Sequence, residues 1–393
     1  MSTLDYASIV NAIKTCLPGD RASYELHEPL FGGHEWDYVK ECIDTGWVSS
    51  AGKYVDRFER DLTDYTGAKH SIAVVNGTAA LHTCLKLVGV EPGDEVLIPA
   101  LTFIATANAV AYCGAVPHFA DSDEYTLGLD PVKLRDYLKE IALLNKYGCY
   151  DRLTGRRIKA VIPMHTFGHP VDLDPLVELC EEYKIELVED AAESLGSLYK
   201  GRHTGNWGRV GALSFNGNKI VTTGGGGAIL TNDPELGKLA KHLTTTAKMP
   251  HAWAFNHDKL GYNYRLPNIN AALGVAQLEQ LPSFIQNKRR LADAYKQALE
   301  DIKGISFFTE PDFGCSNYWL NVMLLQPEYA SERDDLLEYV RALGLMSRPA
   351  WTLMSKLPMY AGCPAMDLSV AQSLEARLIN IPSSAFLAGK GGE

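Results

Sequence analysis

Three polar side chains lie at or just beyond the predicted ends of buried strands. Asp190 ends the apolar run "IELVED", Ser214 lies near the end of "GALSFN", and Lys219 follows in a stretch of small polar residues. Parallel strands bind ligands at their carboxyl ends, so these side chains are expected to meet. A carboxylate there can pair with a ligand cation, and a lysine among neutral residues loses hydration and can become a nucleophile or a base.

A further candidate site is the turn Asn76-Gly77-Thr78, between the predicted strand "SIAVV" and a helix predicted to begin near Ala79. Amides of Gly77, Thr78 and Ala79 at a helix N-terminus would form an anion site. Taken alone, Thr78 is better explained as a helix N-cap, and Asp190 before "AAES" also fits a cap. The sequence has no G-x-x-x-x-G-K-[ST], so a P-loop is not supported.

An anion cradle, a strand-end carboxylate and a lysine, in that order, are the groups that pyridoxal 5'-phosphate (PLP) needs. The cradle would hold the phosphate and the lysine would form a Schiff base. The carboxylate would keep the ring nitrogen protonated, so that the ring accepts electrons. The sequence therefore favours PLP as the cofactor.

The middle of the chain alternates between predicted strands and helices, as in "RIKAVIPMH", "DPLVELCEEYK" and "IELVED". This alternation predicts an α/β fold with a mostly parallel sheet flanked by helices. The segment 96–120 lacks charged Asp, Glu, Lys and Arg and is long enough to span a membrane. Because Pro99, Asn108, Gly114 and Pro117 interrupt it, a strand, a helix and a second strand are expected instead.

The character of the sequence changes after Pro234, where long helices are predicted. One of them covers 268–301, and Pro282 is expected to break it. Beyond about Ile305, short strands and a helix predict a smaller α+β domain. We place the large PLP-binding domain with its N-terminal segment at residues 1–285 and the small C-terminal domain at 286–393, whose terminal "GKGGE" is expected to fray.

Composition indicates an ordinary globular protein, with 46% hydrophobic and 22% charged residues among 393. The net charge of -11 gives no broad attraction to nucleic acid or an anionic membrane. No signal peptide is evident, and eight singly spaced cysteines indicate reduced thiols, so a cytoplasmic protein is expected. His165 and His169 have i, i+4 spacing, but nearby Pro and Gly argue against a zinc pair, and no metal site is expected.

Several motifs resemble those of one known family. "NGTAAL", "PALTFIATANAV", "VEDAAESLGS", "SFNGNK" and "GYNYRLPNINAALG" are similar, in the same order, to the fold-type I sugar aminotransferases of the DegT family. The resemblance extends from about Pro29 to Ser384. "LHEPLFGGHE", "GWVSSAGKYVDRFE", "MHTFGHP" and "NYWL" resemble the branch that acts on UDP-linked 4-keto-6-deoxy sugars in bacillosamine and legionaminic acid pathways.

The resemblance implies a role for each matching residue. Lys219 would be the Schiff-base lysine and Asp190 the acid facing the pyridine nitrogen. Cofactor contacts are implied for Gly77, Thr78, Ala79, Phe103, Asp190, Glu193, Ser214, Lys219 and Asn263. Phe103 would stack on the ring, although core packing explains it as well. Glu193 replaces a Gln or His of relatives, and a carboxylate can donate only when protonated.

Asn263 matches a residue that reaches the phosphate from the neighbouring subunit, which implies a homodimer with shared active sites. Residues that could line a sugar-nucleotide pocket are Trp47, Ser49, Ser50, Tyr318 and Arg348, although each is also explained structurally. No residue is assigned to a metal.

The implied reaction is PLP-dependent transfer of an amino group from L-glutamate to the C4 ketone of a UDP-linked 4-keto-6-deoxy-N-acetylhexosamine, a step in polysaccharide biosynthesis. Two substrates would use one site by turns, with ping-pong kinetics. The alternatives are a dTDP- or GDP-linked sugar and a non-catalytic PLP-binding regulator. A dehydratase of this fold would have His in place of Lys219, and a nicotinamide enzyme would need a G-x-G-x-x-G after an early strand.

Overall fold

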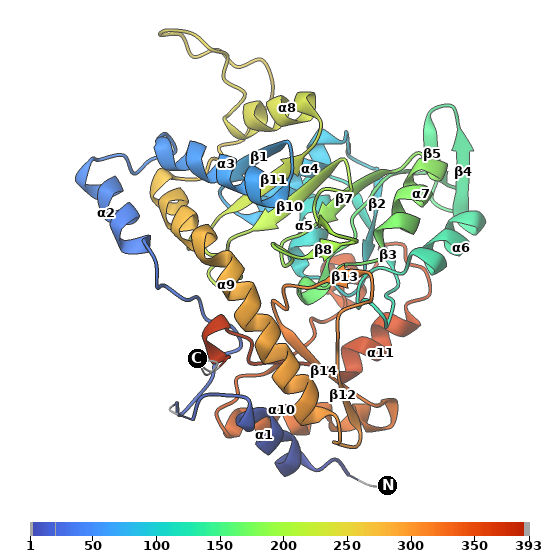
Figure 1. Ribbon diagram of the computed structural model, residues 1–393. Coiled ribbons are helices and arrows are strands. Elements are labelled where there is room, and N and C mark those ends of the chain that lie inside the picture. Colours follow the sequence, from blue (N-terminus) through green and yellow to red (C-terminus); the bar gives the residue numbers. More distant parts are fainter. Residues whose placement is uncertain (1–2, 20, 389–393) are drawn as a thin grey trace.

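The computed structural model describes residues 3–19 and 21–388, and a large mixed sheet forms its centre (Figure 1). Its strands lie in the order β1-β11-β10-β7-β6-β2-β3. From β10 to β3 each neighbouring pair is parallel, whereas β11 is antiparallel to both β1 and β10. The bounds are β1 His70–Val74, β2 Glu95–Pro99, β3 Val116–Ala120, β6 Arg157–Val161, β7 Glu186–Asp190, β10 Val210–Ser214 and β11 Gly227–Thr231. The predicted α/β fold is confirmed.

Helices cover the sheet, and those at 77–87, 104–112 and 173–183 lie where the sequence alternation placed helices. Their bounds are α3 Lys53–Thr66, α4 Gly77–Leu87, α5 Ile104–Tyr112, α6 Pro131–Ile141, α7 Leu173–Tyr183 and α8 Pro234–Thr244. The start of α6 is fixed by Asp130, which accepts hydrogen bonds from the amides of Val132 and Lys133, with Pro131 in the first turn. The segment 96–120 forms β2, α5 and β3, as predicted. Among the described helices, none combines the length and apolar character needed to cross a membrane.

A β-hairpin that the sequence analysis missed extends the sheet. Strands β4 (Ala142–Asn145) and β5 (Gly148–Asp151) pair with each other, and β5 pairs antiparallel with β6. The hairpin projects from one end of the molecule in Figure 1. Its strands are short and lack a clear alternation of apolar residues, so the sequence pattern gave little sign of them.

Helix α9 (Asn268–Leu299) is continuous, so the predicted break at Pro282 is wrong. Proline removes the N–H that would bond to the carbonyl of Leu278. Packing of α9 against α2 (Glu35–Asp44), α3 and α1 (Tyr6–Thr15) keeps the helix in one piece despite that loss. Helix α9 therefore runs through residue 285, and the domain boundary placed there stays a prediction.

A second, antiparallel sheet lies towards the C-terminus, with strand order β12-β14-β16-β15. Its bounds are β12 Ile305–Phe307, β14 Asn321–Leu325, β15 Arg348–Pro349 and β16 Leu378–Ile381, accompanied by α10 Arg333–Ala342 and α11 Ser369–Arg377. The N-terminal helix α1 (Tyr6–Thr15) buries Ile9 and Ile13 in the same apolar core as Met323 and Leu336. The "GKGGE" segment lies outside the described residues.

Candidate active site

The ends of β7 and β10 meet at one cavity of about 310 Å³. The two strands are parallel neighbours, with Ala212 opposite Asp190, so Ser214 and the loop that follows lie beside the Asp190 carboxylate. Seven predicted site residues line the cavity: Gly77, Thr78, Phe103, Asp190, Glu193, Ser214 and Lys219. The meeting of the strand-end side chains is therefore observed.

The N-terminus of α4 forms one wall of this cavity. Helix α4 begins at Gly77, and its N-cap is Asn76, whose Oδ1 accepts the N–H of Ala79 at 2.7 Å. The helix therefore starts two residues before Ala79, and the alternative of Thr78 as the N-cap is wrong. Because the Ala79 amide is already bonded, Gly77 and Thr78 supply the amides that face an incoming anion.

Close packing of glycines fixes this wall. A Cβ on Gly77 would lie 2.9 Å from the Cβ of Ser214, and one on Gly227 would lie 2.6 Å from the carbonyl carbon of Asn76. Only residues without a side chain allow such approaches. The glycines after Lys219 thus bring the loop against the start of α4.

Asp190 is buried and faces the cavity from the end of β7. Its Oδ2 accepts a hydrogen bond from the Thr106 hydroxyl at 2.7 Å, and its Oδ1 accepts the Ala192 N–H at 3.2 Å. Burial raises the pKa of Asp190, and the Thr106 hydroxyl opposes that rise. Residues 191–197 form turns, so Asp190 does not cap a helix.

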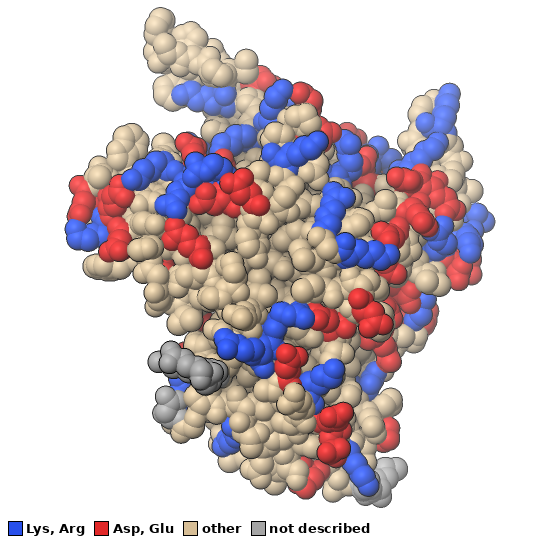
Figure 2. Space-filling view, in the orientation of Figure 1, with Lys and Arg blue, Asp and Glu red and all other residues tan. Residues whose placement is uncertain are grey.

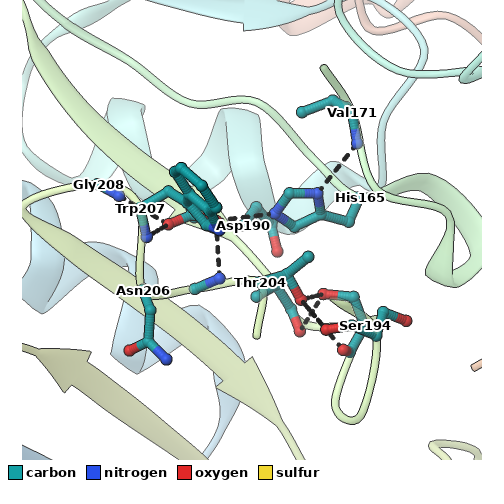
Figure 3. A network of polar contacts seen from close by, with 12 residues as sticks. His165, Val171, Asp190, Ser194, Thr204, Asn206, Trp207 and Gly208 are labelled. Carbon is teal, nitrogen blue, oxygen red and sulfur yellow. Dashed lines mark hydrogen bonds and ion pairs between the residues drawn. The ribbon is translucent and has the colours of Figure 1, made fainter. Parts of the chain in front are cut away.

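The neighbouring residue Glu189 anchors the chain behind Asp190. Its carboxylate accepts the N–H groups of Gly205, Trp207 and Gly208 at 2.6–2.7 Å, and lies 3.1 Å from His165 Nε2. Figure 3 shows this buried network, with His165, Trp207 and Gly208 labelled. Burial would raise the pKa of Glu189, but the His165 and backbone contacts hold it below its usual range. His165 is thus engaged in the network.

Lys219 makes two close contacts in the cavity. Its Nζ lies 3.1 Å from Glu193 Oε1 and 3.7 Å from the ring centroid of Trp319. Glu193 Oε2 also accepts the Phe167 N–H at 2.9 Å. Burial raises the pKa of Glu193 to about 7, and the charge of Lys219 limits the rise. Glu193 can therefore gain or lose a proton near neutral pH.

Phe103 is 48% exposed, so simple core packing does not explain it. Its ring lies 6.3 Å from that of Trp351, which in turn stacks on Phe167 at 4.8 Å. Phe103 and Trp351 both line the cavity. A planar ligand placed there would meet the Phe103 ring.

Other predicted residues lie elsewhere in this chain. Arg348 lines an adjoining cavity of about 470 Å³, which shares Asn218, Trp319 and Trp351 with the first. Trp47 lines a separate pocket beside α2, and the Ser49 carbonyl accepts the amide of Asn268. Tyr318 is buried under His169, away from Lys219. Ser50 and Asn263 are absent from the described lining of the Lys219 cavity, and Asn263 is exposed and contacts Arg265.

Several lining residues were missed by sequence reasoning. They include Met164, Asn218, Trp319 and Trp351, and Thr106 was missed as the partner of Asp190. Trp319 and Trp351 come from the C-terminal third of the chain, and no spacing relates them to Lys219. Thr106 lies within the quoted motif "PALTFIATANAV", which was the available signal.

Comparison with known proteins adds to this geometry. The DegT/DnrJ/EryC1/StrS aminotransferase family model matches residues 31–391. The chain belongs to this family. It is 37% identical over 362 residues to the GDP-perosamine synthase of Caulobacter vibrioides, covering 91% of this chain and 92% of that protein. It is 36% identical to EpsN of Bacillus subtilis, provisionally named a pyridoxal phosphate-dependent aminotransferase, covering 91% and 90%.

A solved structure agrees with the fold. The aminotransferase TlmJ of Streptoalloteichus hindustanus has a TM-score of 0.82 and 29% identity, covering 92% of this chain and 93% of TlmJ. The protein is accordingly a PLP-dependent sugar aminotransferase. The predicted family, fold and cofactor are confirmed. The predicted UDP nucleotide is not confirmed, because one of the relatives named above is a GDP-sugar enzyme.

The residues of this aminotransferase fit PLP. The Gly77–Ser214 contact leaves a cradle that a Cβ would fill, beside the amides and hydroxyls suited to a phosphate. Asp190 is placed to face a ring nitrogen, and Lys219 to reach an aldehyde. The individual contacts stay predictions.

We expect Glu193→Gln to change how stability depends on pH in the PLP-free protein. Because the pKa of Glu193 is raised, the protonated side chain adds to the free energy of unfolding. This contribution is fully present below about pH 4.3 and is lost as pH rises through about 7. Gln cannot ionise, so the variant should gain roughly 2–3 kcal/mol in unfolding free energy relative to wild type between pH 4 and 8. Chemical unfolding at several pH values measures this. A pH-independent difference between the variant and the wild type would contradict it.

We expect Asp190→Asn to retain PLP but to lower turnover by roughly a hundred- to a thousand-fold, because it removes the charge at the cofactor ring. Absorbance of the bound cofactor and steady-state rates measure the two effects. Thr106→Val, which removes only the hydroxyl that supports Asp190, should have a smaller effect, with Thr106→Ser close to wild type. Near-normal turnover of Asp190→Asn would rule out this role.

Proposed function

We propose that this aminotransferase transfers the amino group of L-glutamate to the C4 ketone of a UDP-linked 4-keto-6-deoxy-N-acetylhexosamine. The observation that carries the proposal is the single cavity in which Lys219, Glu193 and Asp190 lie together. PLP, when bound, supplies the electron sink for the reaction. The two substrates use the same cavity by turns.

Each residue has a defined part in this proposal. Lys219 Nζ holds the cofactor and then moves a proton at the α-carbon of the donor, because it is the amine in the cavity. Asp190 keeps the ring nitrogen charged. Glu193, whose pKa is near 7, exchanges a proton with groups beside Lys219. Trp319 covers the Lys219 amine and limits its contact with water.

The adjoining cavity suits the sugar nucleotide. Trp351 and Phe167 offer apolar faces against which a sugar ring can pack, and Arg348 offers a cation for a phosphate. Within residues 3–19 and 21–388, the guanidinium of Arg348 donates a hydrogen bond to the Ser347 carbonyl alone, at 3.1 Å. A substrate spanning both cavities would place its ketone near Lys219.

A GDP-linked 4-keto-6-deoxy sugar is the second candidate. The observation in its favour is the name of the relative from Caulobacter vibrioides, a GDP-perosamine synthase with 37% identity. The motifs in the N-terminal segment support the UDP branch. The nucleotide therefore needs a direct test.

We expect mass spectrometry to show amination of UDP-linked sugar when the protein is incubated with PLP, L-glutamate and a panel of UDP-, GDP- and dTDP-linked 4-keto-6-deoxy sugars. Lys219→Ala is the control and should give no product. Amination of the GDP sugar alone would replace the first candidate by the second. Amination of none would contradict both.

We also propose that two chains form a homodimer with shared active sites. The loop between α8 and α9 projects from the body and is mostly uncharged (Figures 1 and 2). Trp253, Phe255 and Leu260 on this loop are each more than three-quarters exposed, as expected of an interaction surface. Asn263 follows directly and lies outside its own cavity, which is compatible with a contact to the partner's phosphate.

We expect co-expression of Lys219→Ala with Asn263→Asp to restore activity. A carboxylate at position 263 would repel the phosphate, and a mixed dimer would have one intact site. Random mixing then gives about a quarter of wild-type activity, provided that each variant alone is nearly inactive.

The matched control is co-expression of Lys219→Ala with Asp190→Asn, which damages the same chain's site and should give no recovery. If Asn263 serves its own chain, the first mixture also stays at the baseline.

A further inference from the structure

A second cluster of buried titratable groups lies where the β4–β5 hairpin joins the main sheet. Glu95 is the first residue of β2, His118 lies in β3, and Asp151 is the last residue of β5. One nitrogen or oxygen from each side chain lies within 4.8 Å of the others. Each residue is at most 1% exposed. The Lys219 cavity is lined by other residues, so this cluster is separate from it.

The atoms of this cluster point towards one another. His118 Nδ1 lies 3.0 Å from Glu95 Oε2 and 3.9 Å from Asp151 Oδ2. Two ligands that each lie about 2.0–2.2 Å from a zinc ion can be no more than about 4.4 Å apart. Both His118 distances meet that limit, and small side-chain rotations would bring all three atoms to one ion.

Asp151 Oδ2 gives independent evidence that the cluster can bind a further group. It is a buried atom with no hydrogen bond, although the other oxygen of the same carboxylate accepts the Leu153 N–H at 2.7 Å. An unpaired buried carboxylate oxygen is unfavourable. A cation at the cluster would give this oxygen its partner.

The surrounding contacts orient the same three side chains. His118 Nε2 lies 2.9 Å from the Tyr137 hydroxyl, so that an Nε2–H donated there leaves Nδ1 free for a metal. Thr154 donates its hydroxyl to Glu95 Oε1 at 2.6 Å. Arg156, which is 45% exposed, lies 3.8 Å from Glu95 and offsets one of the two negative charges only in part.

From this geometry we propose that Glu95, His118 and Asp151 bind a divalent transition-metal ion that ties the β4–β5 hairpin to the central sheet. The imidazole ligand favours zinc or a similar ion over magnesium and calcium, which prefer oxygen ligands. Two carboxylates and one imidazole leave one position of a tetrahedron for water. Because the three ligands come from β2, β3 and β5, the ion would stabilise the fold.

The test uses the full-length holoenzyme and zinc as the probe. Protein treated with a chelator is supplied with zinc, passed through gel filtration, and analysed for metal by mass spectrometry. We expect about one zinc per chain and a melting temperature several degrees above that of the metal-free protein. Magnesium should give neither effect.

Asp151→Asn is the decisive variant, because it keeps the oxygen that accepts the Leu153 N–H. Asp123→Asn is its matched control: Asp123 Oδ1 accepts the Tyr125 N–H two residues ahead, and its carbonyl accepts the Leu127 N–H four ahead, as Asp151 does with Leu153 and Gly155. Zinc should be lost in Asp151→Asn and retained in Asp123→Asn.

If Asp151→Asn does not fold, Glu95→Gln provides a second loss of one ligand charge. A wild-type protein that retains no zinc and shows no change in melting temperature would overturn the proposal. Equal zinc in wild type and in a folded Asp151→Asn would overturn it as well.

Discussion

Two adjacent carboxylates at the end of β7 determine where the rest of the site lies. Successive side chains of a strand point to opposite faces, so Glu189 and Asp190 leave the sheet on opposite sides. Glu189 binds the three amides of the turn at 205–208, immediately before β10. That contact fixes how β10 enters the sheet, opposite β7 at Ala212 and Asp190, and hence where Ser214 and Lys219 follow. The buried carboxylate of Glu189, on one face of the sheet, thus helps to position Ser214 and Lys219 beside Asp190 on the other face.

The small sheet contributes to the site through Trp319, next to β14. Its Nε1 donates to the Asn218 carbonyl at 2.8 Å, and its own carbonyl accepts from Lys288 Nζ at 3.1 Å. Lys288 is fully buried in α9, and burial lowers its pKa well below the usual range. The ring over Lys219 is therefore held from both sides, by the loop that carries Lys219 and by the long helix.

The sequence predicted the parts of the site that depend on local order. Asp190, Ser214 and Lys219 follow strands with clear apolar patterns, and parallel pairing brings such strand ends together. Sequence reasoning failed where contacts between distant segments of the chain determine the structure. Trp319 and Trp351 reach the cavity only through tertiary packing, and packing also keeps α9 whole across Pro282. The Ala79 amide is a third case. The motif predicted that this amide would bind an anion, but it already donates a hydrogen bond to the Asn76 side chain.

The placement of α1 has a consequence for how the chain acquires its structure during synthesis. Ile9 and Ile13 are buried in one apolar cluster with Met323, Ile379 and Leu387, which are made long after them. The apolar face of α1 must wait for these later residues before it can be fully covered, while the central sheet can already form. Contacts of such long sequence separation form slowly, and the waiting face is open to aggregation in the meantime. Helix α1 is thus made long before some of the residues with which it shares its apolar core.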